Sequence, residues 1–246
     1  DDGHVRSYIH PRPSCDTFAM RLILIRHAQT VANDEGRWQG HSDYPLTPAG
    51  QAQAQALADA LAHEQARQPG EWIDPVLYSS SLGRALATAR PIGQALSVPI
   101  ASRDALREYD VGVFSGCTAT DLDRDYPQII EGFRRDGHWD DVPQAEPVAA
   151  RAQRAEAVIN QLLADHADGQ TVIAVTHGGF MQYLVAALLG TRRIWGFRPE
   201  NTARFEFTLS AAAQREDLGS PGGLSTYRCR INRFNDCVHL TSASRR

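Results

Sequence analysis

Two apolar segments of the sequence each run into a histidine, and this pair of features restricts the fold more than any other. The segments are residues 22–25, followed by Arg26 and His27, and residues 171–176, followed by His177. Short branched apolar runs are typical of buried strands in a parallel sheet, although a short buried helix has the same pattern. In such sheets ligands bind outside the carboxyl ends of the strands. We therefore expect the two histidines to meet in one ligand site.

The remaining segments alternate between strand and helix patterns, which is typical of α/β proteins. Helices are expected at 48–67, after Ser80 or Ser81, at 146–166 and at 178–189; further strands are expected at 75–80, 98–101, 204–209 and 227–231. Residues 219–223 are expected to be a flexible connection between the last two strands. The predicted fold is a three-layer α/β/α sandwich around a mostly parallel central sheet.

The length of the chain predicts one domain, over residues 20–246. Residues 1–19 contain no long apolar run and are expected to form an irregular N-terminal extension. Residues 117–147 are rich in Pro, Gly and acidic residues, so we expect an irregular insertion that caps a pocket, with an ordinary surface excursion as the alternative. The insertion contains Phe133, Arg134, Arg135, His138 and Trp139.

Every one of the 25 basic residues is arginine, because the sequence contains no lysine. This excludes a Walker-type phosphate loop, a Schiff-base lysine and a lysine general base. The net charge of -4 gives no general attraction to nucleic acid or to anionic membranes. No segment approaches the length of a membrane span, so neither nucleic acid nor membrane is expected as a partner.

The four cysteines, Cys15, Cys117, Cys229 and Cys237, show no C-x-x-C spacing. A chain of this length does not need disulfides, so we expect free thiols in a reducing cytoplasm. A Cys229–Cys237 disulfide across late strands is the alternative. Assembly into a homo-oligomer is compatible with the sequence.

Arg84 follows a third strand and is expected at the same sheet edge as Arg26, His27 and His177. Two guanidiniums and two imidazoles repel each other unless a multiply charged anion lies between them. The helix that begins at Gly178 would add backbone N–H groups. The predicted ligand is a phosphoryl group. A metal is the competing ligand for two histidines, but neighbouring arginines oppose a cation, and we expect none.

Two loops complete the predicted site. The loop at 28–46 leaves a strand end, which makes Asn33 and Gln39 candidate ligand contacts. Transfer of a phosphoryl group from an ester requires an acid for the leaving oxygen. Glu108 is the nearest candidate after a strand end, and Asp110 is the reserve.

In this order and at these strand ends, the motifs resemble those of the histidine phosphatase superfamily, in its phosphoglycerate-mutase-like branch. The resemblance covers Arg21 to about Leu240. It rests on Arg26-His27, Asn33, Gln39-Gly40, Pro45-Leu46-Thr47, Ser79-Ser80 with Arg84, Glu108 with Gly112, and His177-Gly178.

The resemblance implies a phosphoglycerate-mutase-like fold and a metal-independent, cofactor-free phosphomonoesterase that acts on a small phosphorylated metabolite. By similarity, His27 takes the phosphoryl group on an imidazole nitrogen. Glu108 protonates the leaving group and then activates water. The phosphoryl oxygens are held by three side chains with help from a fourth: Arg26, Arg84, His177 and Asn33.

Three departures from the family pattern are visible. Ala28 replaces the usual glycine, Ser115 stands where many relatives have glutamate, and residues 133–148 lack a Gly-Gly-Glu-Ser-like run. The last departure weakens inference about the substrate most. We expect substrates to be discriminated by four residues of the insertion: Arg134, Arg135, His138 and Trp139.

Two other functions compete with the phosphatase. Family mutases carry Arg, His and Tyr after the residue that corresponds to Glu108, whereas this chain has Tyr-Asp-Val-Gly, which favours the phosphatase. A catalytically silent module that binds phosphorylated ligands would be expected to have lost His27 or Glu108, and both are present.

Overall fold

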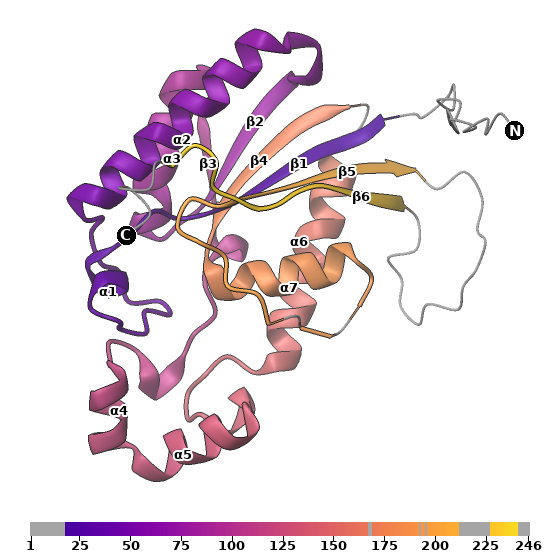
Figure 1. Ribbon diagram of the computed structural model, residues 1–246. Helices are drawn as coiled ribbons and strands as arrows, with labels where there is room; N and C mark the ends of the chain where they lie inside the picture. Colours follow the sequence, from indigo (N-terminus) through magenta and orange to yellow (C-terminus); the bar gives the residue numbers. More distant parts are fainter. Residues whose placement is uncertain (1–17, 167–168, 192, 195, 212–226, 241–246) are drawn as a thin grey trace, which may run out of the picture.

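The described part of the chain forms one six-stranded sheet with helices on both faces (Figure 1). This computed structural model describes residues 18–166, 169–191, 193–194, 196–211 and 227–240. The strand order is β3-β2-β4-β1-β5-β6; the first four strands of this order are parallel to one another, and the last two pair antiparallel. The strands are β1 (Phe18–Arg26), β2 (Ile73–Ser80), β3 (Ile100–Arg103), β4 (Gln170–Thr176), β5 (Arg204–Ala211) and β6 (Tyr227–Asp236). The prediction of a mostly parallel α/β sandwich is confirmed.

The central strands β1 and β4 are buried on both faces, which explains their continuous apolar runs. Leu22 and Leu24 of β1 pack into the larger core cluster, beneath helices α6 (Val148–Asp165) and α7 (Gly178–Leu188). Ile23 and Ile25 point the other way, toward helices α2 (Pro48–Arg67) and α3 (Gly83–Leu96). The alternation of side chains along a strand therefore creates the two outer layers.

The register of the parallel strands brings their functional ends together. Arg26, the last residue of β1, lies opposite Thr176, the last residue of β4. His27 and His177 are the next residues of each chain segment, and the His27 N–H donates to the Thr176 carbonyl at 2.9 Å. The two histidines therefore leave the sheet side by side.

Helix α2 begins as the sequence predicts. Thr47 is its N-cap, and its hydroxyl accepts a hydrogen bond from the Gly50 N–H at 2.9 Å, with Pro48 at the first helical position. The shorter helices of the described residues are α1 (Val31–Asp34), α4 (Ala119–Asp125) and α5 (Pro127–Asp136).

Helix α3 begins differently from the prediction that Ser80 or Ser81 caps it. Its N-cap is Leu82, which has no side chain able to accept a hydrogen bond. The carboxylate of Asp43 instead accepts from the N–H groups of Gly83 and Arg84. A loop that is distant in sequence therefore caps this helix, and no local pattern could reveal it.

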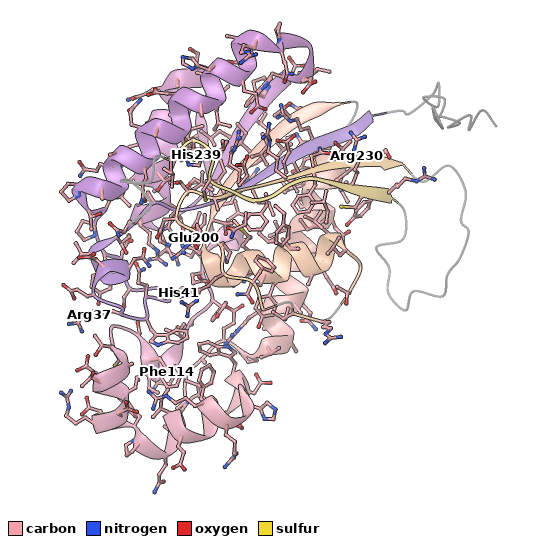
Figure 2. The ribbon with its side chains drawn as sticks, in the orientation of Figure 1. Arg37, His41, Phe114, Glu200, Arg230 and His239 are labelled. Carbon is pink, nitrogen blue, oxygen red and sulfur yellow. The ribbon has the colours of Figure 1, made fainter. Side chains whose placement is uncertain are left out.

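The expectation that residues 117–147 are irregular is wrong. They contain α4 and α5, which form a separate lobe near the carboxyl ends of the parallel strands (Figure 1). These helices have only 7 and 10 residues, and the Pro, Gly and acidic residues in and around them favour a loop when the sequence is considered alone. Figure 2 shows Arg37, His41 and Phe114 along the boundary between this lobe and the rest of the molecule.

Some expectations lie outside the described residues, namely those for residues 1–17 and for the connection at 219–223. Among the described residues, Cys117 and Cys229 are free thiols, so the alternative of a Cys229–Cys237 disulfide is wrong. Within the described residues, no helix combines the length and the apolar character needed to cross a membrane.

Candidate active site

A cavity of about 500 Å³ lies at the carboxyl ends of the parallel strands. Its lining includes all but one of the predicted site residues: Arg26, His27, Asn33, Gln39, Arg84, Glu108 and Gly178. The exception, His177, lies directly behind the lining, with its ring centroid 5.2 Å from that of His27. The structure therefore brings together residues from five separate chain segments.

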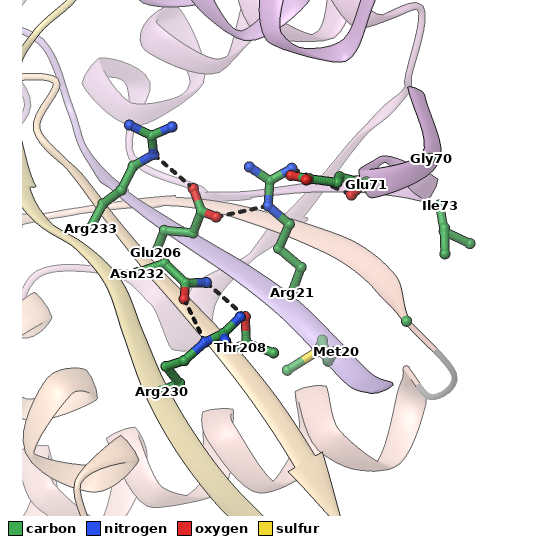
Figure 3. Close-up of a pocket in the computed structure, with 11 residues that line it drawn as sticks. Met20, Arg21, Gly70, Glu71, Ile73, Glu206, Thr208, Arg230, Asn232 and Arg233 are labelled. Carbon is green, nitrogen blue, oxygen red and sulfur yellow. Dashed lines mark hydrogen bonds and ion pairs between the residues drawn. The ribbon is translucent and has the colours of Figure 1, made fainter. Parts of the chain in front are cut away.

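A larger cavity, of about 680 Å³, lies at the opposite end of the sheet (Figure 3). Its charged side chains bind one another, because Glu206 pairs with both Arg21 and Arg233. Its polar side chains also form hydrogen bonds with one another, since Arg230 donates to Asn232 at 3.0 Å. The smaller cavity is the better candidate, because ligands of parallel sheets bind at the carboxyl ends of the strands.

His27 is buried, and its hydrogen bonding selects one tautomer. Its Nδ1 lies 2.8 Å from the Ala28 carbonyl oxygen, which can only accept a hydrogen bond, so Nδ1 carries the proton and Nε2 keeps its lone pair. Burial lowers the pKa of His27 well below its ordinary value, and the positive charges of Arg84 and Arg26 lower it further. The ring is therefore neutral and nucleophilic at Nε2.

Arg84 is 1% exposed and is fixed by the loop that follows β1. Its two terminal nitrogens donate to the carbonyl oxygens of Ser42 and Gly40, each at 2.8 Å. Asp43 lies 3.5 Å from the same guanidinium. Only the planar fork of arginine can bind both carbonyls at once while a third nitrogen remains available.

Three buried nitrogens of the site have no hydrogen-bond partner in the described structure: Arg26 Nε, Arg84 Nε and His177 Nδ1. Arg26 is otherwise anchored by a 2.6 Å hydrogen bond from Nη1 to the Pro199 carbonyl. A buried polar group without a partner costs about 1–3 kcal/mol. Such a cluster is expected where a ligand supplies the missing acceptors, and the two cationic nitrogens require an anion.

His177 is positioned by the end of β2. Its Nε2 lies 2.7 Å from the Ser80 hydroxyl oxygen, so Ser80 orients this ring instead of capping a helix. Burial lowers the pKa of His177 well below its ordinary value, and Arg84 and His27 add to the effect. Both histidines are therefore neutral in the absence of an anion.

Glu108 occupies the N-terminal end of α7, where a phosphoryl group was expected to bind. Its carboxylate accepts hydrogen bonds from the N–H groups of Gly179 at 2.9 Å and Phe180 at 2.7 Å. Two N–H groups of the helix end therefore hold the carboxylate beside the cavity, and Gly178, the first residue of the helix, lines the cavity itself.

The two glycines after His177 are needed for close approach. A Cβ atom on Gly178 would lie 3.1 Å from Arg26 Nε, and one on Gly179 would lie 2.5 Å from the ring of Tyr109 and 2.8 Å from Glu108 Oε1. The glycines therefore allow the arginine and the carboxylate to reach the helix terminus.

The amide side chains of Asn33 and Gln39 are oriented by bonds to their oxygens. Asn33 Oδ1 accepts from the Thr30 N–H at 3.1 Å, and Gln39 Oε1 accepts from the Thr30 hydroxyl at 3.1 Å. These bonds leave the NH₂ groups as the available donors. Asn201, which was assigned no role from the sequence, donates to the His27 carbonyl at 3.0 Å and to Asn33 Oδ1 at 3.3 Å.

Aromatic side chains form one wall of the cavity, and sequence reasoning identified only part of it. Phe133 and Trp139 of the insertion line the cavity together with Trp38 and Tyr109. Arg151 of α6 is fully buried behind this wall, with its guanidinium carbon 3.8 Å from the Tyr109 ring centroid and 4.7 Å from that of Trp139.

The insertion residues predicted to discriminate substrates divide between two locations. Trp139 lines the cavity, whereas Arg134, Arg135 and His138 are exposed and lie outside the lining. Arg134 pairs with Asp123 of α4. Of the four residues expected to discriminate substrates, only Trp139 therefore contacts the cavity. Arg134 and Arg135 lie on the charged side of α5, which faces solvent, and His138 lies in the exposed turn after this helix.

Three polar side chains that the sequence did not single out also line the cavity: Arg37, Gln182 and Arg198. Arg37 donates to Glu35 and approaches Asp121. In the sequence, Arg198 lies between α7 and β5 and does not directly follow a parallel strand. The pattern of strand ends therefore could not identify it.

Comparisons with known proteins agree with this geometry. The model of the histidine phosphatase superfamily (branch 1) matches residues 22–216. Glucosyl-3-phosphoglycerate phosphatase of Mycolicibacterium vanbaalenii is 34% identical over 229 residues, which is 90% of this chain and 97% of that protein. Phosphoserine phosphatase 1 of Hydrogenobacter thermophilus is 31% identical over 186 residues, covering 75% of this chain and 84% of the relative.

Solved structures show the same relationship. A mycobacterial glucosyl-3-phosphoglycerate phosphatase in complex with VO3 superimposes with a TM-score of 0.69 and 28% identity, over 87% of this chain and 98% of the other. Relatives named as phosphatases support the prediction of a phosphoric monoester hydrolase. The motifs, the fold and the matched family agree, and the chain belongs to branch 1 of the histidine phosphatase superfamily.

Proposed function

We propose that the chain hydrolyses a small phosphate monoester in two steps, through a phosphohistidine on His27. The observation that supports this most is the pairing of a buried, neutral His27 with two guanidiniums whose Nε groups have no partner. A neutral imidazole is a nucleophile, and the guanidiniums require an anion next to it.

In the first step, Arg26, Arg84 and His177 bind the phosphoryl oxygens, and Asn33 and Gln39 donate from their amide groups. His27 Nε2 attacks phosphorus, so that a P–N bond forms while the ester P–O bond breaks. The bonding electrons leave with the alkoxide, which takes its proton from Glu108. The arginines stabilise the transition state more than the bound substrate, because charge accumulates on the phosphoryl oxygens there.

In the second step, the Glu108 carboxylate accepts a proton from water. The water oxygen attacks phosphorus, the P–N bond breaks, and the electron pair returns to His27 Nε2. Inorganic phosphate leaves, and Glu108 is protonated for the next cycle. Because two N–H groups of α7 hold the carboxylate, the same group is kept in place for both proton transfers.

Transfer to a hydroxyl group instead of water would make the chain a mutase. Relatives include a protein named as a probable phosphoglycerate mutase, GpmB of Enterobacter sp., at 33% identity over 174 residues. The same first step serves both reactions, and only the acceptor differs. Hydrolysis is the better proposal, because relatives named as phosphatases align over more of the chain.

We further infer that residues 117–147 act as a cap within a single domain of residues 20–246. The positions of Phe133 and Trp139 in the cavity wall support this role. The free thiols Cys117 and Cys229 support a reducing compartment, and we propose a cytoplasmic location.

The test is phosphate release from a panel of small monoesters with excess EDTA, with wild type compared to His27→Ala. We expect turnover to survive EDTA and to fall by about a thousandfold or more in the variant, as for the loss of a catalytic nucleophile. His63→Ala on the exposed side of α2 is the matched control. No turnover by folded wild type, or undiminished turnover by His27→Ala, would contradict the proposal.

A further inference from the structure

Arg198 is the cavity-lining cation that the proposed chemistry leaves unused. Arg26 and Arg84 hold the phosphoryl group in that proposal, and Arg37 already pairs with Glu35. Among the described residues, no carboxylate forms an ion pair with Arg198, although its side chain is exposed and lines the cavity. Its positive charge helps to lower the pKa of the buried Arg26, which burial lowers most, whereas the carboxylates of Glu108 and Glu200 act in the opposite direction. Arg198 and Glu200 are therefore both close enough to Arg26 to act on its charge.

The backbone around Arg198 is fixed on both sides. Asn235 donates to the Arg198 carbonyl at 3.2 Å and accepts from the Glu200 N–H at 2.9 Å. On the other side, Gln182 donates to the Phe197 carbonyl at 3.2 Å. The ring of Phe197 also packs against Phe205 and Phe234. An arginine on so well-anchored a segment is positioned to recognise a ligand.

Arg198 belongs to the same cavity as the proposed phosphoryl site. The next residue, Pro199, accepts the hydrogen bond from Arg26 Nη1 at 2.6 Å, and both Arg198 and Pro199 line the cavity together with Arg26 and His27. A group bound by Arg198 can therefore belong to the same ligand as the phosphoryl group. The lining also includes Trp38, Tyr109 and Trp139, which carry no charge, and Arg37, which is paired with Glu35.

We propose that Arg198 binds a carboxylate of the substrate, so that the preferred substrates are phosphate monoesters of small hydroxy acids. This inference rests on the proposed phosphatase function and names its substrate class. One guanidinium matches one carboxylate through paired N–H donors. A second phosphate group would bring about two negative charges to a position with a single uncommitted cation, so a carboxylate fits better.

The test uses substrate pairs that differ only at the carboxylate. O-phospho-L-serine is compared with O-phosphoethanolamine, and 3-phosphoglycerate with glycerol 3-phosphate. Wild type is expected to have a higher kcat/KM for the acid of each pair. In Arg198→Gln that preference should shrink about tenfold or more, since a hydrogen bond to a charged group contributes about 1.5–3 kcal/mol. The kcat/KM of Arg198→Gln for O-phosphoethanolamine and for glycerol 3-phosphate should stay within about twofold of the wild-type value.

Arg230→Gln is the matched control, because it removes the same charge from β6 at the far end of the sheet (Figures 2 and 3). Arg230→Gln should keep the wild-type preference for acids. Arg198→Lys should keep more of this preference than Arg198→Gln, since lysine keeps the positive charge but lacks the paired N–H donors of arginine. Equal kcat/KM values within each pair for wild type, or an equal loss for both members in Arg198→Gln, would overturn the proposal.

Binding measurements separate this inference from the proposed function. Titration calorimetry of His27→Ala with phosphoserine and phosphoethanolamine reports the carboxylate contact without any chemistry. If wild type hydrolyses p-nitrophenyl phosphate but shows no preference for acids in either assay, only the inference fails. If wild type hydrolyses no monoester while the Arg198-dependent preference for phosphoserine persists in binding, only the proposed function fails.

Discussion

Asn201 donates a hydrogen bond from its side-chain amide to the main-chain carbonyl of His27, at 3.0 Å. The same amide lies 3.3 Å from Asn33 Oδ1. The residue after it, Thr202, donates from its own N–H to the Arg26 carbonyl at 3.1 Å. The turn before β5 therefore fixes the backbone at the end of β1, where the proposed nucleophile lies.

Asn201→Ala should lower kcat about tenfold with a small change in KM. The two hydrogen bonds orient His27 and Asn33 and are each worth about 1 kcal/mol, and about 1.4 kcal/mol in a barrier is tenfold in rate. Steady-state kinetics with a good substrate measure the effect. Asn160→Ala on the exposed side of α6 is the control and should match wild type. A change confined to KM would argue against a positioning role.

Glu108→Gln should slow the hydrolysis of alkyl phosphates far more than that of p-nitrophenyl phosphate. An alkoxide needs a proton to leave, whereas p-nitrophenolate does not, so loss of the acid affects the two esters unequally. Rates of phosphoenzyme formation from rapid-quench experiments provide the comparison. The phosphoenzyme should also accumulate, since water lacks its base. Equal slowing of both esters would mean that another group supplies the proton.

Gly179→Ala should reduce activity at least tenfold, because the added Cβ would lie 2.8 Å from Glu108 Oε1 and 2.5 Å from the Tyr109 ring. Displacement of the carboxylate from its N–H donors misplaces the proposed acid. Gly132→Ala is the matched control, since a Cβ there meets nothing within 4 Å. Because Gly132 lies inside α5, that variant should gain up to about 1 kcal/mol in stability. Wild-type kcat in Gly179→Ala would refute the close-approach argument.

Acid should destabilise the protein through its buried histidines. Burial lowers the pKa of His27 and of His177 well below the ordinary value of 6.5. Below about pH 6.5 the unfolded chain binds protons that the folded chain excludes, so the free energy of unfolding falls as pH decreases. The slope is about 1.4 kcal/mol per pH unit for each such histidine, until the folded group itself is protonated.

The contribution of His27 can be isolated by urea unfolding at about pH 7 and about pH 5.5. Substitution by glutamine removes one titrating group, so His27→Gln should lose less stability than wild type over this interval. His63→Gln on the exposed side of α2 is the matched control and should keep the wild-type slope. Identical slopes for all three proteins would show that His27 is not held neutral.

The strand ends could be predicted from sequence because β1 and β4 are buried on both faces and so produce continuous apolar runs. Parallel pairing then requires that residues after each run meet at one edge, which applied to His27, His177 and Arg84. Local pattern and sheet topology were sufficient for these residues, because each lies next to the end of a parallel strand.

The remaining site residues depend on tertiary contacts that leave no local trace. Asn201 and Arg198 lie in a turn that precedes an antiparallel strand, where the strand-end argument does not apply. Arg151 is buried because the rings of Tyr109 and Trp139 cover it, although an arginine in a helix ordinarily indicates a solvent-facing position. The carboxylate of Asp43 caps α3 from 40 residues away. In each case the partner is distant in sequence.

The buried nitrogens of Arg26, Arg84 and His177 also have a consequence for the thermodynamics of the whole chain. They come together only when β1, α3 and the start of α7 are assembled, so the unfolded polypeptide has no equivalent anion site. An oxyanion that fills this cavity binds the folded state alone and raises the free energy of unfolding, by about 1.4 kcal/mol at ten times its dissociation constant. Inorganic phosphate, the product of the proposed reaction, would thereby protect the fold against heat, urea and proteolysis in proportion to the logarithm of its concentration.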